Sequence, residues 1–155
     1  MDMTVTEADA SMLPDLTAIE TASFTCPWSE DSFRAALESD AVSVPVCLSG
    51  EGTPVGFACL LTAADEGELL NIACAPASRR TGVAQRLLDR CLELCRRKGV
   101  SFLYLEVRES NVPARSLYRK NGFNEIGVRR NYYEKPRENA VLMRLALSPD
   151  AEGNS

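Results

Sequence analysis

The chain has 155 residues, with 17 Lys and Arg against 22 Asp and Glu, and a formal net charge of −5. This length fits one domain, and a hydrophobic content of 45% is enough for a sizeable core. The negative charge argues against a nucleic-acid partner. No apolar run approaches the roughly 20 residues that cross a membrane, and no signal segment opens the sequence, so we expect a cytoplasmic protein with no membrane partner.

The sequence contains no histidine, and this narrows the chemistry. Triads and dyads that use histidine are excluded, so a general base must be a carboxylate, a lysine, a tyrosine, a cysteine or water. Six cysteines lie mostly in apolar runs and form no C-x-x-C pair, at positions 26, 47, 59, 74, 91 and 95. We expect reduced thiols in the core and no metal site.

The first half of the chain predicts strands and two helices. Helices are expected over 11–23 and from Ser29, a good N-cap, to about residue 37. The predicted strands are 4–6, 41–48, 54–61 and 68–74, with a polar turn at 62–67. The second and third of these strands read as a hairpin, and Pro45 indicates an edge or a bulge.

The second half begins with the strongest helix pattern, over 82–98, which ends at Gly99. A further helix is expected over 112–120, with Ser110 or Asn111 as its cap. The remaining predicted strands are 101–107, 123–130 and 139–147, with a loop at 131–138.

This order of elements predicts an α/β (α+β) fold. We expect a mixed, mostly antiparallel sheet of six to seven strands with helices on both faces, and a right-handed βαβ unit over 68–107. Residues 1–147 are expected to form a single domain, and the polar tail 148–155 to be disordered.

Residues 79–84 read R-x-x-G-x-A, between a predicted strand and the strongest predicted helix. The first N–H groups of a helix have no partner within it and carry the positive end of its dipole. Gly82 lets a ligand approach the backbone, while Arg79 and Arg80 add charges that suit phosphate. The pattern predicts an anion site, although a plain surface turn is the alternative.

Together with Asn111 and with Leu117-Tyr118-x-x-x-Gly122-Phe123, this motif resembles the GNAT acetyltransferase superfamily over about residues 4–147. Within it, the chain is most similar to the bacterial ribosomal-protein-alanine N-acetyltransferases of the RimI type. The stretches that carry this closer resemblance are Pro27-Trp28-Ser29, Asn71-Ile72-Ala73, Leu105 to Asn111, Gly122 to Glu125, and Arg129-Arg130-Asn131-Tyr132-Tyr133.

The resemblance implies transfer of acetyl from acetyl-CoA, in a ternary complex, to the α-amine of an N-terminal alanine of a small-subunit ribosomal protein. The general base then falls on Glu106 and the general acid on Tyr118. The implied cofactor contacts are Ile72, Ala73, Cys74, Arg79, Arg80, Thr81, Gly82, Val83, Ala84, Gln85 and Asn111. Two positions depart from the usual pattern: Ala84 stands where glycine is frequent, and Cys74 where an aliphatic residue is usual.

The chemistry agrees with these roles. An α-amine of pKa about 7.7–8.0 must lose a proton before it attacks, and partial burial of Glu106 would raise its pKa toward the working range. A phenol such as that of Tyr118 can protonate a departing thiolate. The alternatives are a solvent-facing Glu106 or a partner for Arg108, a core Tyr118, and for Asn111 a plain helix cap.

Aromatic residues are predicted to form the acceptor site. We expect Trp28, in the loop from Phe24, and Tyr132 and Tyr133 to wall the first peptide residues, with packing in a satellite core as the alternative. Two other functions stay open: acetylation of a lysine, polyamine or small amine, and acyl-CoA binding without turnover. We expect a monomer, and no acyl-enzyme on Cys74, because no histidine is present to activate it.

Overall fold

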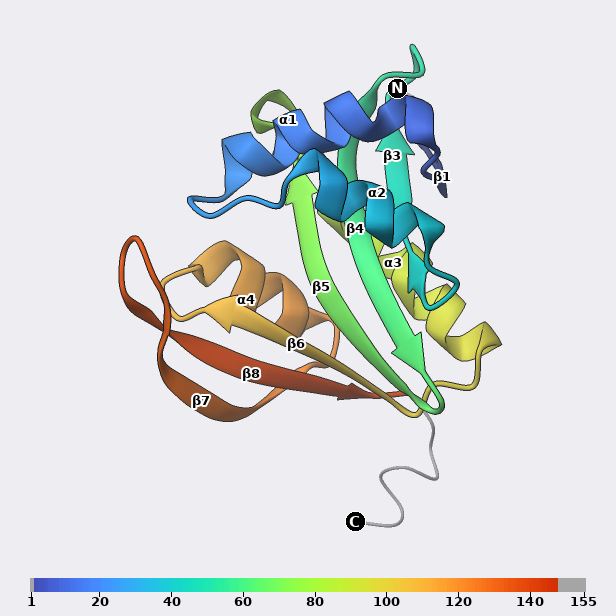
Figure 1. The fold of residues 1–155 in the computed structure, drawn as a ribbon. Coiled ribbons are helices and arrows are strands. Elements are labelled where there is room, and N and C mark those ends of the chain that lie inside the picture. The colour runs from blue at the N-terminus through green and yellow to red at the C-terminus, as the bar shows by residue number, and fades with distance from the viewer. Residues whose placement is uncertain (1, 148–155) are drawn as a thin grey trace. The chain divides into compact units, whose positions relative to one another are not determined.

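The structure is a computed structural model that describes residues 2–147, drawn in Figure 1. The predicted disordered tail, 148–155, lies outside the described residues. The chain forms two compact units. The first contains the chain up to Leu61 together with Leu70–Leu94, and the second contains Thr62–Leu69 with the chain from Cys95 onward.

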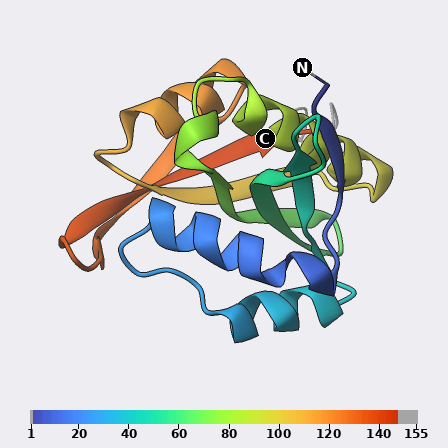
Figure 2. The same ribbon diagram turned by 90° about the horizontal axis from the view of Figure 1, so that it is seen from above.

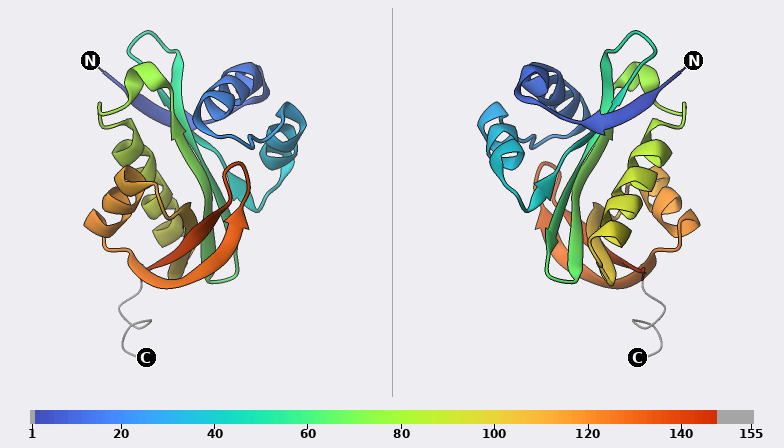
Figure 3. Two further views of the ribbon diagram at one scale, coloured as in Figure 1. Left: turned by 90° about the vertical axis from the view of Figure 1, so that its left-hand side faces the viewer. Right: turned by 90° about the vertical axis from the view of Figure 1, so that its right-hand side faces the viewer.

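The first unit is a sheet with helices on both faces. Its strands are β1 (Thr4–Glu7), β2 (Val42–Ser43), β3 (Pro45–Leu48), most of β4 (Pro54–Ala63) and the end of β5 (Glu66–Cys74). Its helices are η1 (Ala10–Met12), α1 (Leu13–Ser23), α2 (Glu30–Glu38), η2 (Pro76–Ser78) and most of α3 (Val83–Arg97). Strand β3 pairs antiparallel with both β1 and β4. Figure 3 shows α1 and α2 on one side of these strands and α3 on the other.

Helices α1 and α2 form one layer, side by side in Figures 2 and 3. The Ser29 side chain caps α2, as predicted, by accepting a hydrogen bond from the Ser32 N–H. Phe33 of α2 is fully buried, and its ring lies 5.2 Å from Phe57 of β4 and 5.3 Å from Trp28. These ring contacts fix the loop before α2 against the core.

The N-terminus of α3 lies close to the sheet because β4 carries a glycine there. A Cβ on Gly56 would come within 2.5 Å of Val83 Cγ1 and 3.0 Å of the Ala73 carbonyl oxygen. A larger residue at this position would push α3 away from β4 and β5. Gly56 therefore sets where the first turn of α3 meets the end of β5.

The second unit contains the start of β5 with β6 (Phe102–Arg108), α4 (Val112–Lys120), β7 (Asn124–Tyr133) and β8 (Glu138–Ala146). Its strand order is β5-β6-β8-β7, in which β5 and β6 are parallel and the other pairs antiparallel. Burial alternates along β6, with Leu103, Leu105 and Val107 buried. Glu106 therefore belongs to the less buried face of the strand.

The predicted fold class is confirmed, and the elements follow in the predicted order. The described chain has eight strands, because the segment predicted as one strand over 41–48 is divided into β2 and β3. Pro45 is the first residue of β3, where the missing N–H is tolerated. Of the two alternatives for Pro45, the edge strand is wrong, since β1 pairs with β3 on its other side, whereas the β3–β4 ladder does shift register between Cys47 and Leu48, as at a bulge.

Two predicted loops are shorter in the structure. The turn predicted at 62–67 is reduced, because β4 continues to Ala63 and β5 begins at Glu66. The loop predicted at 131–138 is also wrong in extent, because β7 runs to Tyr133 and β8 begins at Glu138. The ladder between β7 and β8 shifts register between Arg129 and Tyr133, and Asn131 has a φ of 52°. This bulge explains the loop-like sequence.

Candidate active site

The predicted anion site is a tight turn in the first unit. After β5 and η2, the chain passes through Arg80, with a φ of 64°, and Gly82, with a φ of 88°. When successive residues alternate between right-handed and left-handed backbone conformations, their N–H groups point into one concavity, which suits an anion. The α3 ladder begins when the Arg86 N–H donates to the Gly82 carbonyl at 3.1 Å. Gly82 lies in open space, since a Cβ there would meet no atom within 4 Å.

The side chains of this turn are of two kinds: exposed arginines, and side chains that stabilise the turn. The guanidinium groups of Arg79 and Arg80 are exposed, while Val83 is buried against the sheet. Thr81 donates its hydroxyl proton to the Ser78 carbonyl, and Arg79 Nη2 lies 3.5 Å from Ser23 Oγ at the end of α1. The buried Val83 and the Thr81 hydrogen bond thus stabilise the turn, while its two arginine charges face solvent, where a phosphate can bind.

Residues 72–74 form the end of β5, with Ala73 buried and its two neighbours half-buried. The Ala84 N–H hydrogen-bonds to the Cys74 sulfur, which joins the strand end to α3. Burial raises the pKa of the Cys74 thiol above its ordinary value, against a smaller opposing effect of the Arg79 guanidinium. The thiol is therefore protonated at neutral pH, which argues against a nucleophilic role.

In the second unit, Glu106 lies within a polar and aromatic group. Its side chain is 21% exposed, and one carboxylate oxygen lies 3.5 Å from Arg129 Nε. The Tyr132 hydroxyl donates a hydrogen bond to it. Arg108 has Glu138 as a carboxylate partner, at 3.4 Å, and its guanidinium lies 4.4 Å from the Tyr133 ring centroid. The contacts of Glu106 therefore come from β7, not from the sequence neighbour considered above.

Tyr132 and Tyr133 pack edge to face, with ring centroids 5.0 Å apart. Tyr132 is 49% exposed, whereas Tyr133 is half-buried. The hydrogen bond to Glu106 is the first cause of a raised pKa for Tyr132, and burial is the first cause of a raised pKa of about 12 for Tyr133. Both phenols therefore keep their protons at neutral pH, and Tyr132 stays a donor to Glu106.

Tyr118 and Asn111 each take the structural role considered as an alternative. Tyr118 is 5% exposed, and its ring lies 5.5 Å from that of Phe123. Asn111 caps α4, because its Oδ1 accepts a hydrogen bond from the Ala114 N–H at 3.2 Å. Packing of the Tyr118 ring and capping by the Asn111 side chain are each compatible with a second role for the same residue.

Comparisons with known proteins identify the family of the chain. Residues 13–123 match the model of the acetyltransferase (GNAT) family. The chain belongs to the GNAT family.

Full-length relatives of this GNAT chain carry a more specific name. The [ribosomal protein bS18]-alanine N-acetyltransferase of Escherichia coli strain K12 is 35% identical over 147 residues, which is 94% of this chain and 98% of that protein. The protein of the same name from Haemophilus ducreyi is 37% identical, over 93% of this chain and 98% of its own length. The crystal structure of the ribosomal-protein-S18-alanine N-acetyltransferase from E. coli has a TM-score of 0.88 at 34% identity, covering 95% of each chain. The resemblance to this group is confirmed, and the chain is an acetyltransferase.

GNAT enzymes use acetyl-CoA, and the turn at 79–85 fits its phosphates. The fit rests on the two left-handed residues, the open space at Gly82 and the exposed arginines. Among residues 2–147, no three His, Cys, Asp or Glu side chains are grouped to hold a metal ion, and no helix is long and apolar enough to span a membrane.

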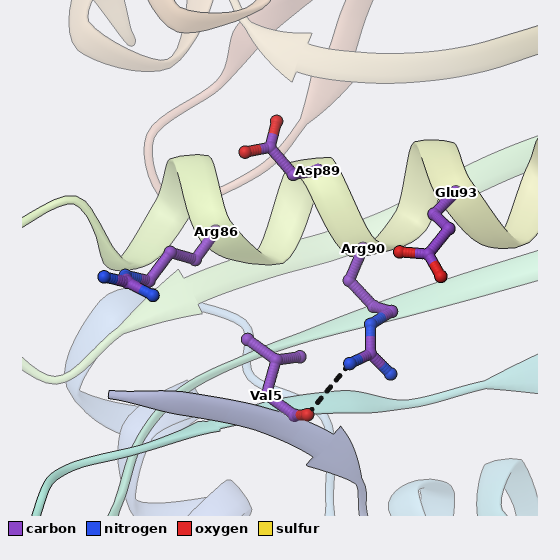
Figure 4. A pocket seen from close by; sticks show the side chains of 5 residues that line it. All are labelled: Val5, Arg86, Asp89, Arg90 and Glu93. Carbon is purple, nitrogen blue, oxygen red and sulfur yellow. Dashed lines mark hydrogen bonds between the residues drawn. The ribbon is translucent and has the colours of Figure 1, made fainter. Parts of the chain in front are cut away.

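The predicted residues fall into two groups. The cofactor residues of β5 and of the 79–85 turn lie in the first unit with Trp28, while Asn111, Glu106, Tyr118 and the tyrosine pair lie in the second. None of them lines the hollow of about 310 Å³ between β1 and α3. Figure 4 shows that this hollow is walled by alternating charges of α3, with Arg90 Nη2 bonded to the Val5 carbonyl at 3.0 Å.

Sequence reasoning missed Glu20. It is 2% exposed, and it is the one charged side chain that is buried among the described residues. Its carboxylate accepts hydrogen bonds from the Trp28 N–H at 2.9 Å and from Asn71 Nδ2 at 3.0 Å. The available signal was its position, since it follows Ile19 on the same helix face as Leu13 and Leu16.

Proposed function

We propose that this GNAT enzyme transfers acetyl from acetyl-CoA to the α-amine of an N-terminal alanine, on a small-subunit ribosomal protein. The observation that supports this acceptor is the similarity to enzymes of that name over nearly the whole of both chains. We further propose that residues 1–147 act as one catalytic domain, in the cytoplasm and as a monomer, with no nucleic-acid or membrane partner.

Glu106 is the proposed general base. Its environment supports this role, because a half-buried carboxylate with one donor and one cation keeps a defined orientation while part of it reaches solvent. The proton that it takes is that of an α-amine, with a pKa of about 7.7–8.0. A lysine amine has a pKa about 2.5 units higher, so its deprotonation costs roughly 3.5 kcal/mol more. One carboxylate therefore suits the α-amine better.

The other roles follow from the residue types and from family membership. Acetyl-CoA, when bound, supplies the activated acetyl group. The backbone of the turn at 79–85 holds its phosphates, and the backbone of 72–74 and Asn111 contacts its arm. The Tyr118 hydroxyl gives a proton to the departing thiolate. Trp28, Tyr132 and Tyr133 contact the first residues of the acceptor peptide.

The test is acetyl transfer to a short peptide that begins with Ala-Arg, with release of CoA followed across pH. A second peptide with a blocked N-terminus and an internal lysine is the comparison. We expect turnover of the first peptide alone, and a loss of at least about 100-fold in kcat for Glu106→Gln and Tyr118→Phe. The exposed Glu109, just beyond β6, provides the control Glu109→Gln.

The outcomes separate the proposal from its alternatives. Turnover of the peptide with the blocked N-terminus would show that the acetyl acceptor is a lysine or another amine. Binding of acetyl-CoA with no turnover of any amine would indicate a binding module. Full activity of Glu106→Gln would remove this residue as the base and leave the family membership intact.

A further inference from the structure

The last turn of α1 connects three segments of the candidate site in the first unit. Glu20 and Ser23 are three residues apart and share one helix face. The Glu20 carboxylate bonds to Trp28 in the loop before α2 and to Asn71 of β5, and Ser23 Oγ lies beside Arg79 of the anion turn. Glu20 thus contacts two of these segments and Ser23 the third, which packing within the core of α1 alone would not require.

The geometry of the Glu20 carboxylate is that of a two-armed acceptor. One oxygen accepts from the Trp28 backbone N–H, and the other accepts from the Asn71 side chain. Asn71 Oδ1 is buried and has no hydrogen-bond partner in the part of the chain that the structure describes. Asn71 immediately precedes the 72–74 segment, so its side chain is anchored one residue from the proposed acetyl contacts.

Joining two segments through a buried carboxylate costs free energy, because the charged group loses its hydration. Burial raises the pKa of Glu20, with smaller opposing effects from the Trp28 and Asn71 hydrogen bonds, and the Glu20 carboxylate in turn contributes to the raised pKa of the buried Cys59 thiol. Replacement of a buried charged group by an apolar side chain of similar size is often neutral or stabilising. What the Glu20 carboxylate gains in its buried position is two hydrogen bonds, to the loop that carries Trp28 and to Asn71 of β5.

We propose that Glu20 is a positioning residue, whose carboxylate joins the Trp28 loop to Asn71 of β5 and so holds the acceptor-binding loop beside the acetyl-binding strand end. The role in acceptor binding rests on the function proposed above. Glu20 acts through its two hydrogen bonds and touches no reacting atom. The proposal separates this acceptor-side effect from cofactor binding, because the anion turn has its own internal hydrogen bonds.

The hydrogen-bond pattern predicts which substitutions preserve the connection. In Glu20→Gln, the amide oxygen can still accept from the Trp28 N–H, and its NH2 can donate to the unpartnered Asn71 Oδ1 after Asn71 turns over. In Glu20→Leu both donors lose their acceptor. In Asn71→Asp two carboxylates face each other, and the double variant Glu20→Gln with Asn71→Asp restores a donor against an acceptor.

The experiment measures kinetics and the state of the loop separately. We expect Glu20→Leu to raise the KM for the alanine peptide about tenfold, with the KM for acetyl-CoA changed less than about twofold. Glu20→Gln should stay within about threefold of wild type, and Asn71→Asp should be impaired but rescued in the double variant. The matched control is Glu38→Leu, at an exposed position of α2.

Trp28 is the only tryptophan of the chain, so its fluorescence reports on this loop without any need for turnover. Acrylamide quenching should increase in Glu20→Leu and Asn71→Asp, and return toward wild type in the double variant. Unchanged quenching in both single variants would overturn the proposed connection. Changed quenching with an unchanged peptide KM would overturn its role in acceptor binding.

Two further results decide the remaining cases. If Glu20→Leu does not fold, rescue of Asn71→Asp by Glu20→Gln still supports the proposal, and absence of rescue overturns it. If wild type acetylates no alanine peptide, the proposed function fails by itself, while the quenching series still decides whether Glu20 holds the loop.

Discussion

At the scale of single residues, the environment of Glu106 is made by side chains more than 20 positions away. Arg129 and Tyr132 lie on β7 and reach a carboxylate on β6, although β8 lies between the two strands in the sheet. The bulge at 129–133 allows this, because two extra residues on β7 turn the end of this strand relative to its partner. The irregular part of β7 is thus the part that faces the candidate base.

Removal of the Tyr132 hydroxyl tests this contact. We expect Tyr132→Phe to lower kcat/KM about tenfold, because the carboxylate loses a donor that fixes its orientation. The pKa of Tyr132 is raised above its ordinary value, so its proton is present throughout the pH range below about 10. The alkaline side of the pH–rate profile should therefore have the same shape in both proteins.

Tyr104→Phe is the matched control, since it removes a hydroxyl from the half-exposed face of β6, beside Phe102. Equal losses in the two variants would show that the effect of Tyr132 does not depend on Glu106. An alkaline limb present in wild type and absent from Tyr132→Phe would show instead that ionisation of Tyr132 itself controls the rate.

At the scale of elements, α3 is bounded by two glycines in the left-handed backbone conformation. Gly82 precedes the helix, with a φ of 88°, and Gly99 follows it, with a φ of 72°; a Cβ at either would meet no atom within 4 Å. Alanine at either position should cost about 1 kcal/mol of stability from backbone strain alone. Equilibrium unfolding of Gly82→Ala and Gly99→Ala checks this.

Only one of these glycines belongs to the proposed anion site. Gly82→Ala should raise the dissociation constant of acetyl-CoA about tenfold or more, since the new methyl group occupies the approach to the backbone. Gly99→Ala should bind acetyl-CoA as wild type does. Equal affinities in the two variants would remove the turn at 79–85 as the phosphate site.

The N-cap of α4, Asn111, poses a similar question. Asn111→Ala and Ser29→Ala each remove an N-cap, of α4 and α2, and each should lower the free energy of unfolding by about 1 kcal/mol. Asn111→Asp keeps a capping oxygen and loses the amide. If Asn111 also contacts acetyl-CoA through its amide, Asn111→Asp should keep its stability but lose turnover; full turnover would leave the cap as its sole role.

The elements were largely predictable from the sequence because their signals are local. Ser29, Gly82, Gly99 and Asn111 lie where capping and turn chemistry place them. The errors came from pairing: Pro45 looked like an edge residue because the sequence does not show β1 beside β3. The contacts of Glu106 and Glu20 are also non-local, so their chemical types were visible and their partners were not.

At the scale of the whole molecule, the net charge of −5 favours a cationic acceptor. We expect an alanine peptide with two downstream arginines to have a KM about threefold lower than its two-glutamine counterpart at low ionic strength. This advantage should shrink as salt is raised to about 0.5 M, where exposed charges are screened over a few ångströms. Initial rates for both peptides across a salt series provide the measurement.

The uncharged peptide is the internal control, since its KM should vary little over the same series. An equal salt dependence for both peptides would mean that the protein's charge acts on something other than the acceptor.

The path of the chain between its two compact units has a further consequence. The chain leaves the first unit near the end of β4, returns within β5, and leaves again near the end of α3. No single cut therefore separates the two units, because every cut leaves at least one of them divided between the two pieces. Recombination between related genes would face the same constraint, because a crossover between Thr62 and Leu94 would mix two parental versions of both units. We therefore expect the segment from the end of β4 to the end of α3 to come from a single parent in functional recombinants.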